Sequence, residues 1–231
     1  MKIPRNTKSR SKKQMDTAVN SESRMERKRR RNRQVLIEAA YEVISSQGID
    51  STTMQKISEV ADVGLGTIYN YFDSKEDLVM QVMALVMDHM AQRILKVTDT
   101  FSDSAQVCAY GYWSLMDQTM TDPRWHWLIN RPDVFADAMY NCFGPYAITD
   151  MKNGVAEGRY IVDNPELVWR QTVWAIVGVI IAVDQKEFPI SCLEDAIVNL
   201  LYLLGVDRVE AREIAQRPRP KLPKENLFDK K

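Results

Sequence analysis

The sequence predicts an all-α protein in which an N-terminal three-helix unit with a helix-turn-helix precedes a larger helical body. Apolar residues recur at spacings of three and four along most of the 231 residues, and no segment alternates apolar and polar residues as a half-buried strand would. Glycine, proline and short capping sequences divide this pattern into segments of helical length. A chain of this size can bury a core in each of two units that share a boundary.

Basic residues are concentrated at the N-terminus, although the formal net charge of the chain is zero. Residues 1–33 contain 13 Lys and Arg against 3 Asp and Glu, which leaves 18 basic and 28 acidic residues in the remainder. Residues 1–25 also contain few apolar side chains, so we expect a flexible basic arm there. This end of the chain is therefore suited to a polyanion such as nucleic acid.

The first two helices are expected directly after this arm. Gly48 is suited to the left-handed conformation that ends a helix, and it follows an apolar face made of Leu36, Ala39, Ala40, Val43 and Ile44. Thr52, with Gln55 three residues later, forms a capping-box pattern. We therefore expect the second helix to begin at Thr52.

A tight turn and a third short helix come next. We expect Gly64 to relieve steric strain in the turn 62–64, and a helix over residues 65–72 to bury Ile68 and Phe72. Two short helices joined by a tight turn can place a helix end in the major groove of DNA. Plain packing of a helix pair is the alternative interpretation.

The remainder of the chain predicts longer helices. Ser74 and Asp77 form a capping-box pattern before a helix expected to reach about residue 97. Breaks are expected at 121–123, 131–132, 144–145 and 163–165. Late helices are expected to start at Asn164, which precedes a proline, and at Ser191, which has Glu194 three residues on. After a last helix over 209–216, we expect residues 217–231 to form a flexible tail.

Three segments carry a resemblance to a known family. Residues 52–57, 63–72 and 74–78 read TTMQKI, VGLGTIYNYF and SKEDL. Over residues 33–86 the chain closely resembles the TetR family of bacterial transcriptional regulators. The resemblance implies a helix-turn-helix DNA-binding domain over 26–73 and a helical ligand-binding and dimerisation domain over 74–216. It also implies a cytoplasmic homodimer that binds palindromic operator DNA as a repressor and is released by a small, apolar or aromatic ligand.

In that family the segment matching residues 65–71 is the recognition helix. Small residues permit close approach to DNA and hydroxyl groups reach phosphate oxygens, while Asn70 can pair with adenine and Leu65 can touch a thymine methyl group. The predicted DNA contacts are Arg33, Thr53, Gly64, Leu65, Gly66, Thr67, Tyr69, Asn70, Tyr71 and Lys75. Gly64 stands where a serine is common, and Leu65 where a polar or basic residue is frequent. We therefore expect the basic run 27–31 and Arg33 to supply the missing attraction, unless that run is only a solvated tail.

The apolar late helices predict a dimer contact. In the family the matching helix pair forms a four-helix bundle with its two-fold mate. The predicted contacts are Val173, Ile176, Val177, Ile180, Ile197, Leu200, Leu201 and Leu204. A buried core in a monomer is the alternative.

The segment 107–160 is rich in aromatic residues, which suit an apolar ligand cavity and equally suit an ordinary core. The predicted ligand contacts are Trp113, Trp125, His126, Phe135, Tyr140 and Trp174. A DNA-binding helical dimer that a protein partner controls, or that has no ligand, is the alternative function.

Other classes of protein are poorly supported. Cys108, Cys142 and Cys192 are widely spaced, so they indicate neither a disulfide framework nor a zinc site. We also find no phosphate-binding loop, no nucleophile elbow and no metalloprotease pattern, and we therefore expect no catalytic residue, no metal and no cofactor. The longest apolar run, 172–183, is too short to span a bilayer, so we expect no membrane partner.

Overall fold

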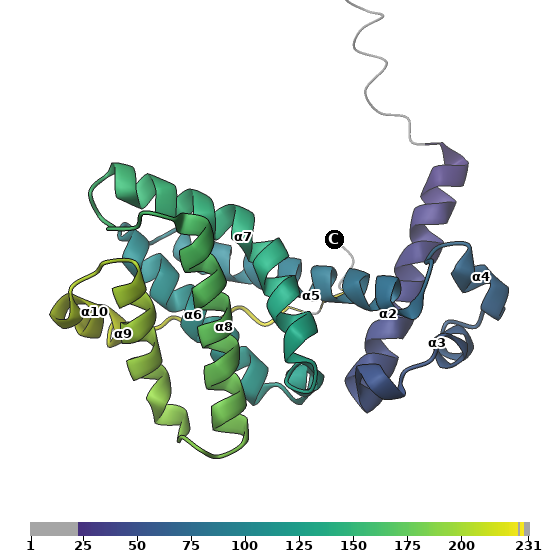
Figure 1. Cartoon of the computed structure of the whole chain (residues 1–231). Helices are drawn as coiled ribbons and strands as arrows, with labels where there is room; N and C mark the ends of the chain where they lie inside the picture. Colours follow the sequence, from purple (N-terminus) through teal and green to yellow (C-terminus); the bar gives the residue numbers. More distant parts are fainter. Residues whose placement is uncertain (1–22, 226, 229–231) are drawn as a thin grey trace, which may run out of the picture.

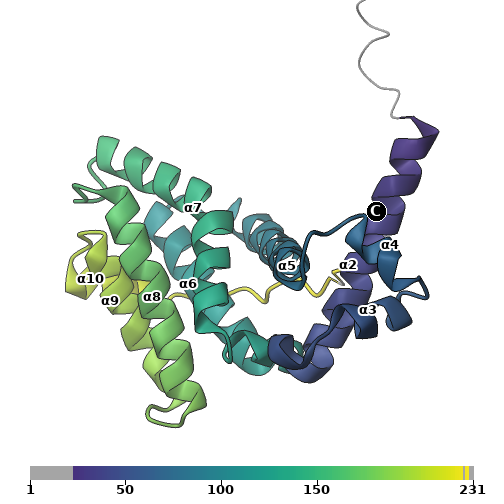
Figure 2. The same cartoon turned by 45° about the vertical axis from the view of Figure 1, so that its right-hand side comes forward.

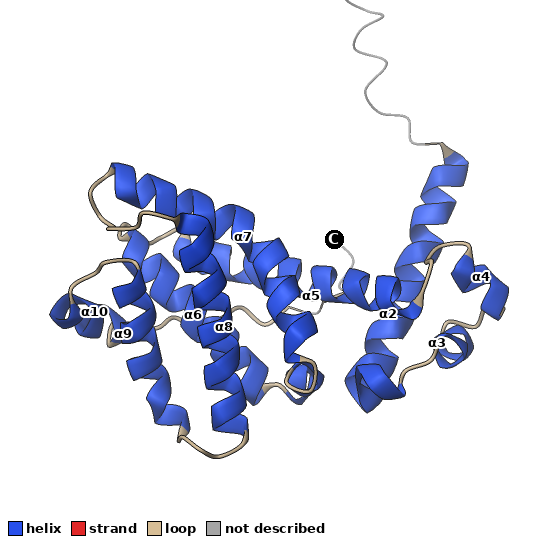
Figure 3. Ribbon diagram, viewed as in Figure 1, coloured by secondary structure: helices blue, strands red, loops and turns tan. Residues whose placement is uncertain are grey.

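The computed structural model describes residues 23–225 and 227–228, and over these ranges it is helical and contains no strand (Figure 3). The all-α prediction is therefore confirmed. The helices are α2 (Arg24–Ser51), α3 (Met54–Val60), α4 (Leu65–Tyr69), α5 (Lys75–Thr98), α6 (Ser104–Thr121), α7 (Pro132–Ala156), α8 (Pro165–Asp184), α9 (Leu193–Leu203) and α10 (Arg208–Ala215), with the 3-10 turns η1 (Pro123–Leu128) and η2 (Ile190–Cys192).

The chain forms a small head and a larger body joined by α5 (Figure 1). Helices α3 and α4 lie beside α2 at one end of the molecule, and α6 to α10 gather at the other. Figure 2, turned by 45°, shows the same separation of head and body. Because α5 follows α4 directly and packs against α2, α6 and α7, it is the element through which the two parts are connected.

Helix α2 begins earlier than the sequence indicates. The Ser23 hydroxyl accepts a hydrogen bond from the backbone N–H of Glu26, and the Glu26 carboxylate accepts one from the N–H of Ser23, which makes a complete capping box. The basic run 27–31 therefore lies on the first turns of a helix. Of the predicted arm, only residues 23–25 are described. Residues 1–22 lie outside the described residues. Gly48 takes the expected positive φ of 80° and kinks the helix near its end.

The caps within the head are shifted by one or two residues from the prediction. Thr53, not Thr52, caps α3 by accepting a hydrogen bond from the N–H of Lys56, while the Thr52 hydroxyl donates to the carbonyl of Gly48 at 2.6 Å. The turn residue with positive φ is Asp62, at 52°, whereas Gly64 has a φ of −67°. An aspartate tolerates the left-handed conformation well enough for the turn, which leaves Gly64 free to begin α4.

Two predicted boundaries in the body are wrong. Pro145 lies inside α7, because the packing of this long helix against both α5 and α8 outweighs the one backbone hydrogen bond that a proline removes. Ser191 does not cap α9, since it lies in the 3-10 turn that precedes the helix. The predicted caps Ser74 and Asn164 are confirmed, and they accept hydrogen bonds from the N–H groups of Asp77 and Leu167.

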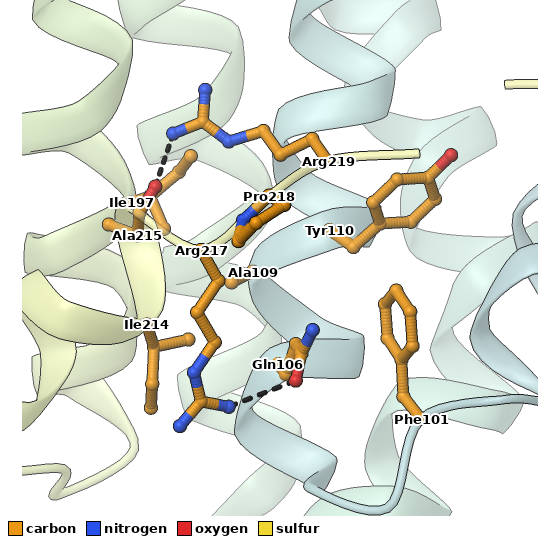
Figure 4. A pocket seen from close by; sticks show the side chains of 10 residues that line it. All are labelled: Phe101, Gln106, Ala109, Tyr110, Ile197, Ile214, Ala215, Arg217, Pro218 and Arg219. Atoms are coloured by element: carbon orange, nitrogen blue, oxygen red, sulfur yellow. Dashed lines mark hydrogen bonds between the residues drawn. The ribbon is translucent and has the colours of Figure 1, made fainter. Parts of the chain in front are cut away.

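The described residues of the predicted flexible tail pack along the body. Residues 217–225 and 227–228, which we call the C-terminal strap, leave α10 and cross the body toward the head (Figure 1). At its start Arg217 binds Asp103 at 2.8 Å. Arg217 also binds Gln106 at 2.9 Å, and the Arg219 guanidinium donates to the carbonyl of Ala215 (Figure 4). Ion pairs and main-chain contacts of this kind give the segment partners that its composition does not reveal.

Further along, the strap reaches the helix that joins body and head. Tyr110 donates to the carbonyl of Pro220 at 3.0 Å, and the Nε of Arg93 donates to the carbonyl of Pro223 at 2.8 Å. At the end of the strap the ring of Phe228 meets the ring of Tyr41 edge to face, with centroids 5.5 Å apart. Because Tyr41 belongs to α2, the strap connects the body to the head a second time.

Helix α8 is a long and strongly apolar helix of the body. By length and composition alone it would pass as a membrane-spanning helix, a test that core helices of soluble proteins also pass. The uninterrupted apolar run 172–183 is shorter than the helix, so it did not indicate a segment of membrane-spanning length. One face of α8 packs on α6, α7 and α9, but only a third of the helix is buried in the single chain.

Candidate DNA-binding face and internal cavity

Helix α4 has one anchored face and one exposed face. Ile68, on the helix, and Phe72, just beyond it, are fully buried and fix α4 to the head, as predicted. The opposite face consists of Leu65, Gly66, Tyr69 and Asn70, and the side chains of Leu65 and Tyr69 are 42% and 53% exposed. Spacings of three and four residues place these four on one side of the helix.

Two of the predicted contacts on this helix are less accessible. Thr67 and Tyr71 are half-buried, and the Tyr71 hydroxyl accepts a hydrogen bond from the amide of Asn32 on α2 at 3.2 Å. Asn70 is exposed, and its side-chain amide has no hydrogen-bond partner within the described residues. Asn70 is therefore the side chain of α4 best placed to bond to a base edge.

The flanking predicted contacts have partners inside the head. The Lys75 ammonium donates to the carbonyl of Ile49 at 3.2 Å, so it binds the end of α2. The Arg33 guanidinium lies over the ring of Phe72, 5.2 Å from its centroid. The Thr53 hydroxyl caps α3, and Gly64 is exposed at the start of α4.

The first turns of α2 form a strongly basic projection. Arg24, Arg27, Lys28, Arg29, Arg30 and Arg31 are all exposed, and Glu26 is the one acidic residue among them. Figure 1 shows this purple part of α2 extending away from α3 and α4. A helix that presents so many cations to solvent is suited to a row of phosphates.

The body contains an apolar cavity of about 110 Å³ among α5, α6, α7 and α8. Leu115 on α6, Met139 on α7 and Ile176 on α8 form part of its wall. Ala91 and Ile94 line it from α5. The cavity therefore adjoins the same helix that leads to the head.

Polar groups are gathered at one end of this cavity. Cys108, Tyr112 and Asp150 line that end, and the Cys108 sulfur lies 3.6 Å from the Tyr160 hydroxyl. Burial raises the pKa of Cys108 to about 11 and holds the pKa of Tyr112 well above its usual value. Both groups are therefore neutral near pH 7.

The six predicted ligand residues do not gather round this cavity. Trp125 and Phe135 are buried elsewhere in the core, and Trp113 contacts Arg219 of the strap. Tyr140 lies under the Arg170 guanidinium, and His126 lies 3.7 Å from Asp184 at the surface. Trp174 is exposed on α8. An aromatic-rich sequence does not indicate which rings face a cavity, since core packing uses the same residues.

The residues predicted for the dimer contact are buried within the single chain. All eight are at most 3% exposed and pack within the protomer's own core. The single chain contains no partner, and the dimer contact of these residues stays a prediction. Other apolar side chains of the late helices and their connection face outward, namely Leu167, Trp174, Phe188, Ile190, Tyr202 and Leu203. Helical periodicity identified the buried inner face of these helices, and the apolar face that is left uncovered lies on their other side.

Comparison with known protein families finds one match in the head and the start of α5, and a second match in the body. Residues 36–82 match the family described as "Bacterial regulatory proteins, tetR family", and residues 103–217 match "Tetracyclin repressor-like, C-terminal domain". HTH-type transcriptional regulators of Staphylococcus aureus are 25% identical over 83 residues, which is 36% of this chain and 45% of theirs. The chain thus matches less than half the length of these curated relatives.

Solved structures extend the similarity over the body. RolR in complex with resorcinol is 26% identical with a TM-score of 0.76, and the match covers 85% of this chain and 99% of RolR. FadR from Bacillus subtilis in complex with stearoyl-CoA is 18% identical with a TM-score of 0.57 over 75% of this chain and 99% of its own, and so supports the fold alone. Together the two matched domains and these structures show that the chain belongs to the TetR family of bacterial transcriptional regulators.

Proposed function

We propose that this transcriptional regulator binds palindromic operator DNA as a cytoplasmic homodimer, represses transcription there, and is released when a small apolar or aromatic ligand occupies the cavity among α5 to α8. The observation that carries the proposal is the exposed face of α4. Its inner side holds the head together, whereas Leu65, Gly66, Tyr69 and Asn70 have no packing role. An unpaired amide beside a glycine suits close reading of a base edge.

The cavity favours control by a ligand over control by a protein partner alone. A body that only dimerises needs no apolar hollow against the helix that leads to its DNA-binding head. The structure of RolR with resorcinol supports the same view, because RolR is similar to this chain over nearly its whole length. The relatives found are regulators, and we propose no enzymatic activity.

The DNA proposal is tested by selecting bound sequences from a pool of random duplexes with the purified full-length chain. We expect a palindromic consensus, because a two-fold dimer presents two copies of α4 about one DNA turn apart. Asn70→Ala is expected to relax the preference at one position in each half-site, at a cost of about 1–3 kcal/mol. A consensus without symmetry would contradict the dimer, and no enrichment would contradict the DNA-binding role.

The dimer proposal rests on the uncovered face of α8, where Trp174 is 48% exposed. Trp174→Glu places a charge on this face and is expected to shift the protein to monomers in sedimentation experiments. Val209→Glu is the matched control, since Val209 is an exposed apolar residue of α10. If both variants remain dimeric, a different surface forms the dimer.

The basic projection of α2 is expected to supply the attraction that α4 lacks. Replacing Arg27, Lys28, Arg29 and Arg31 by glutamine should lower the slope of log affinity against log salt by roughly 0.9 for each phosphate that is no longer neutralised. Arg208→Gln with Arg212→Gln on the remote helix α10 serves as the control. An unchanged salt slope in the α2 variant would remove this role from the projection.

A further inference from the structure

The cavity among α5 to α8 has one charged group on its wall. Of the seventeen described residues that line it, only Asp150 is charged, and nearly all of the remaining surface is apolar. A single carboxylate against an apolar wall distinguishes ligands by charge much more sharply than by shape. The identity of the ligand's polar group therefore depends on what Asp150 can accept.

The Asp150 carboxylate has no partner of its own. It accepts no hydrogen bond and forms no ion pair within the described part of the chain. It lies on α7, lines the cavity and is exposed to solvent. Partial burial raises its pKa, and its charge raises the pKa of Cys108 and Tyr112 beside it. A hydrogen-bond donor at this point would stabilise the ionised form, and a second anion would be repelled.

The directions of three of the helices give the cavity a polar end and an apolar end. Helices α5 and α7 run away from the head, while α6 runs back toward it (Figure 1). Asp150 and Cys108 consequently lie at the end remote from the head, whereas Leu115 and Met139 lie nearer to it. A ligand with one polar group is therefore oriented with its apolar part toward the head.

The volume limits the size of the apolar part. An apolar cavity of roughly 150 Å³ accommodates one benzene molecule, and this cavity measures about 110 Å³. A single ring fits after small side-chain adjustments, and its polar substituent can extend toward Asp150. A long acyl chain exceeds this space.

We propose, on the basis of the ligand-controlled function argued above, that the effector is a single-ring compound with a neutral or cationic hydrogen-bond donor, a phenol, alcohol or amine, which binds the Asp150 carboxylate while its ring packs near Leu115, Met139 and Ile176. Ring compounds whose only polar group is a carboxylate are excluded by the same residue. In this proposal Asp150 determines which ligand charge is accepted, and the apolar end of the cavity contacts the ring.

The test uses three compounds that share one ring and differ only in charge, namely benzylamine, benzyl alcohol and benzoate. Isothermal titration calorimetry on the full-length protein is expected to show that the amine and the alcohol bind at least about tenfold more tightly than benzoate, the lower limit for a hydrogen bond to a charged group. Asp150→Asn should reduce this difference in affinity, because it weakens binding of benzylamine and allows benzoate to bind. Glu157→Gln, which removes an exposed carboxylate from the C-terminal end of α7, should leave it unchanged.

A second variant locates the ligand. Gly111 lines the cavity from α6, and a Cβ added there would first meet Ile94 at 3.9 Å. Gly111→Val fills part of the space and should abolish binding of all three compounds while the thermal unfolding transition remains cooperative. The proposal is overturned if benzoate binds most tightly, if Asp150→Asn leaves the order of affinities intact, or if none of the three binds the native protein. Calorimetry involves no DNA, so a chain that selects a palindrome and fails here loses only this inference.

Discussion

Replacing Gly66 by alanine separates DNA contact from folding. Gly66 is the second residue of α4, and a Cβ built on it meets no atom within 4 Å. Alanine within a helix is more stable than glycine by about 0.5–1 kcal/mol, because glycine loses more conformational freedom on folding. The variant should therefore be at least as stable as the native chain, with a Tm raised by up to about 2–4 °C for a protein of this size.

The same methyl group should weaken DNA binding. It projects from the face shared by Leu65, Tyr69 and Asn70, where the proposed function places the base edges. We expect affinity for the selected duplex to fall at least about tenfold, equivalent to roughly 1.4 kcal/mol. Calorimetric melting and fluorescence anisotropy on one preparation give both quantities. Asn141→Ala, at an exposed position within α7, is the control that raises helix propensity far from the head.

Two results would refute this reasoning. A lower melting temperature for Gly66→Ala would mean that the added Cβ collides with the head, contrary to the geometry of α4. Unchanged DNA affinity in a stable variant would mean that DNA does not approach the surface around Gly66. A stable protein with weakened binding is the one combination that both arguments require.

Three further substitutions test the body and the strap. Gly154→Ala places a Cβ 2.1 Å from the buried ring of Tyr160, so thermal melting should show a loss of about 1–3 kcal/mol or more, and an unchanged Tm would contradict this packing. Ending the chain after Gln216 removes the carbonyl that Arg93 binds and the ring that Tyr41 contacts; urea denaturation should show a loss of about 1–3 kcal/mol, and no loss would mean that the strap contributes nothing. Because burial raises the pKa of Cys108 to about 11, its alkylation by iodoacetamide, followed by mass spectrometry, should be slow at pH 8 and accelerate up to that pH, whereas a rate that levels off near pH 9 would show an ordinary thiol.

Many of the helix boundaries and the core of the head could be predicted because their signals are local. The capping residues Ser74 and Asn164, the positive φ of Gly48 and the buried pair Ile68 and Phe72 each depend on residues within about one helical turn. The errors in the head were small shifts between neighbours that can play the same role. Thr52 and Thr53 can both cap a helix, and the structure uses the second.

The site in the body could not be predicted in the same way. Periodicity shows that Val173 and Leu201 are buried, but it does not show whether the covering surface is their own chain or a second one. Composition likewise cannot distinguish Trp169, which lines the cavity, from Trp125, which does not. The strap was missed because its basic and proline residues indicate disorder, while its partners Asp103 and Arg93 lie more than a hundred residues away.

The connections between head and body determine how a ligand could act on DNA binding. A ligand changes DNA affinity only if it binds two arrangements of the protein with different free energies. The cavity wall includes Ala91 and Ile94 of α5, and the first residue of that helix, Lys75, binds the end of α2. Arg93, also on α5 and only 8% exposed, donates a hydrogen bond to the strap, whose Phe228 contacts Tyr41 of α2. A displacement of α5 by a ligand is therefore passed to α2 at two separate points, which favours movement of the head as a unit over local fraying of α4.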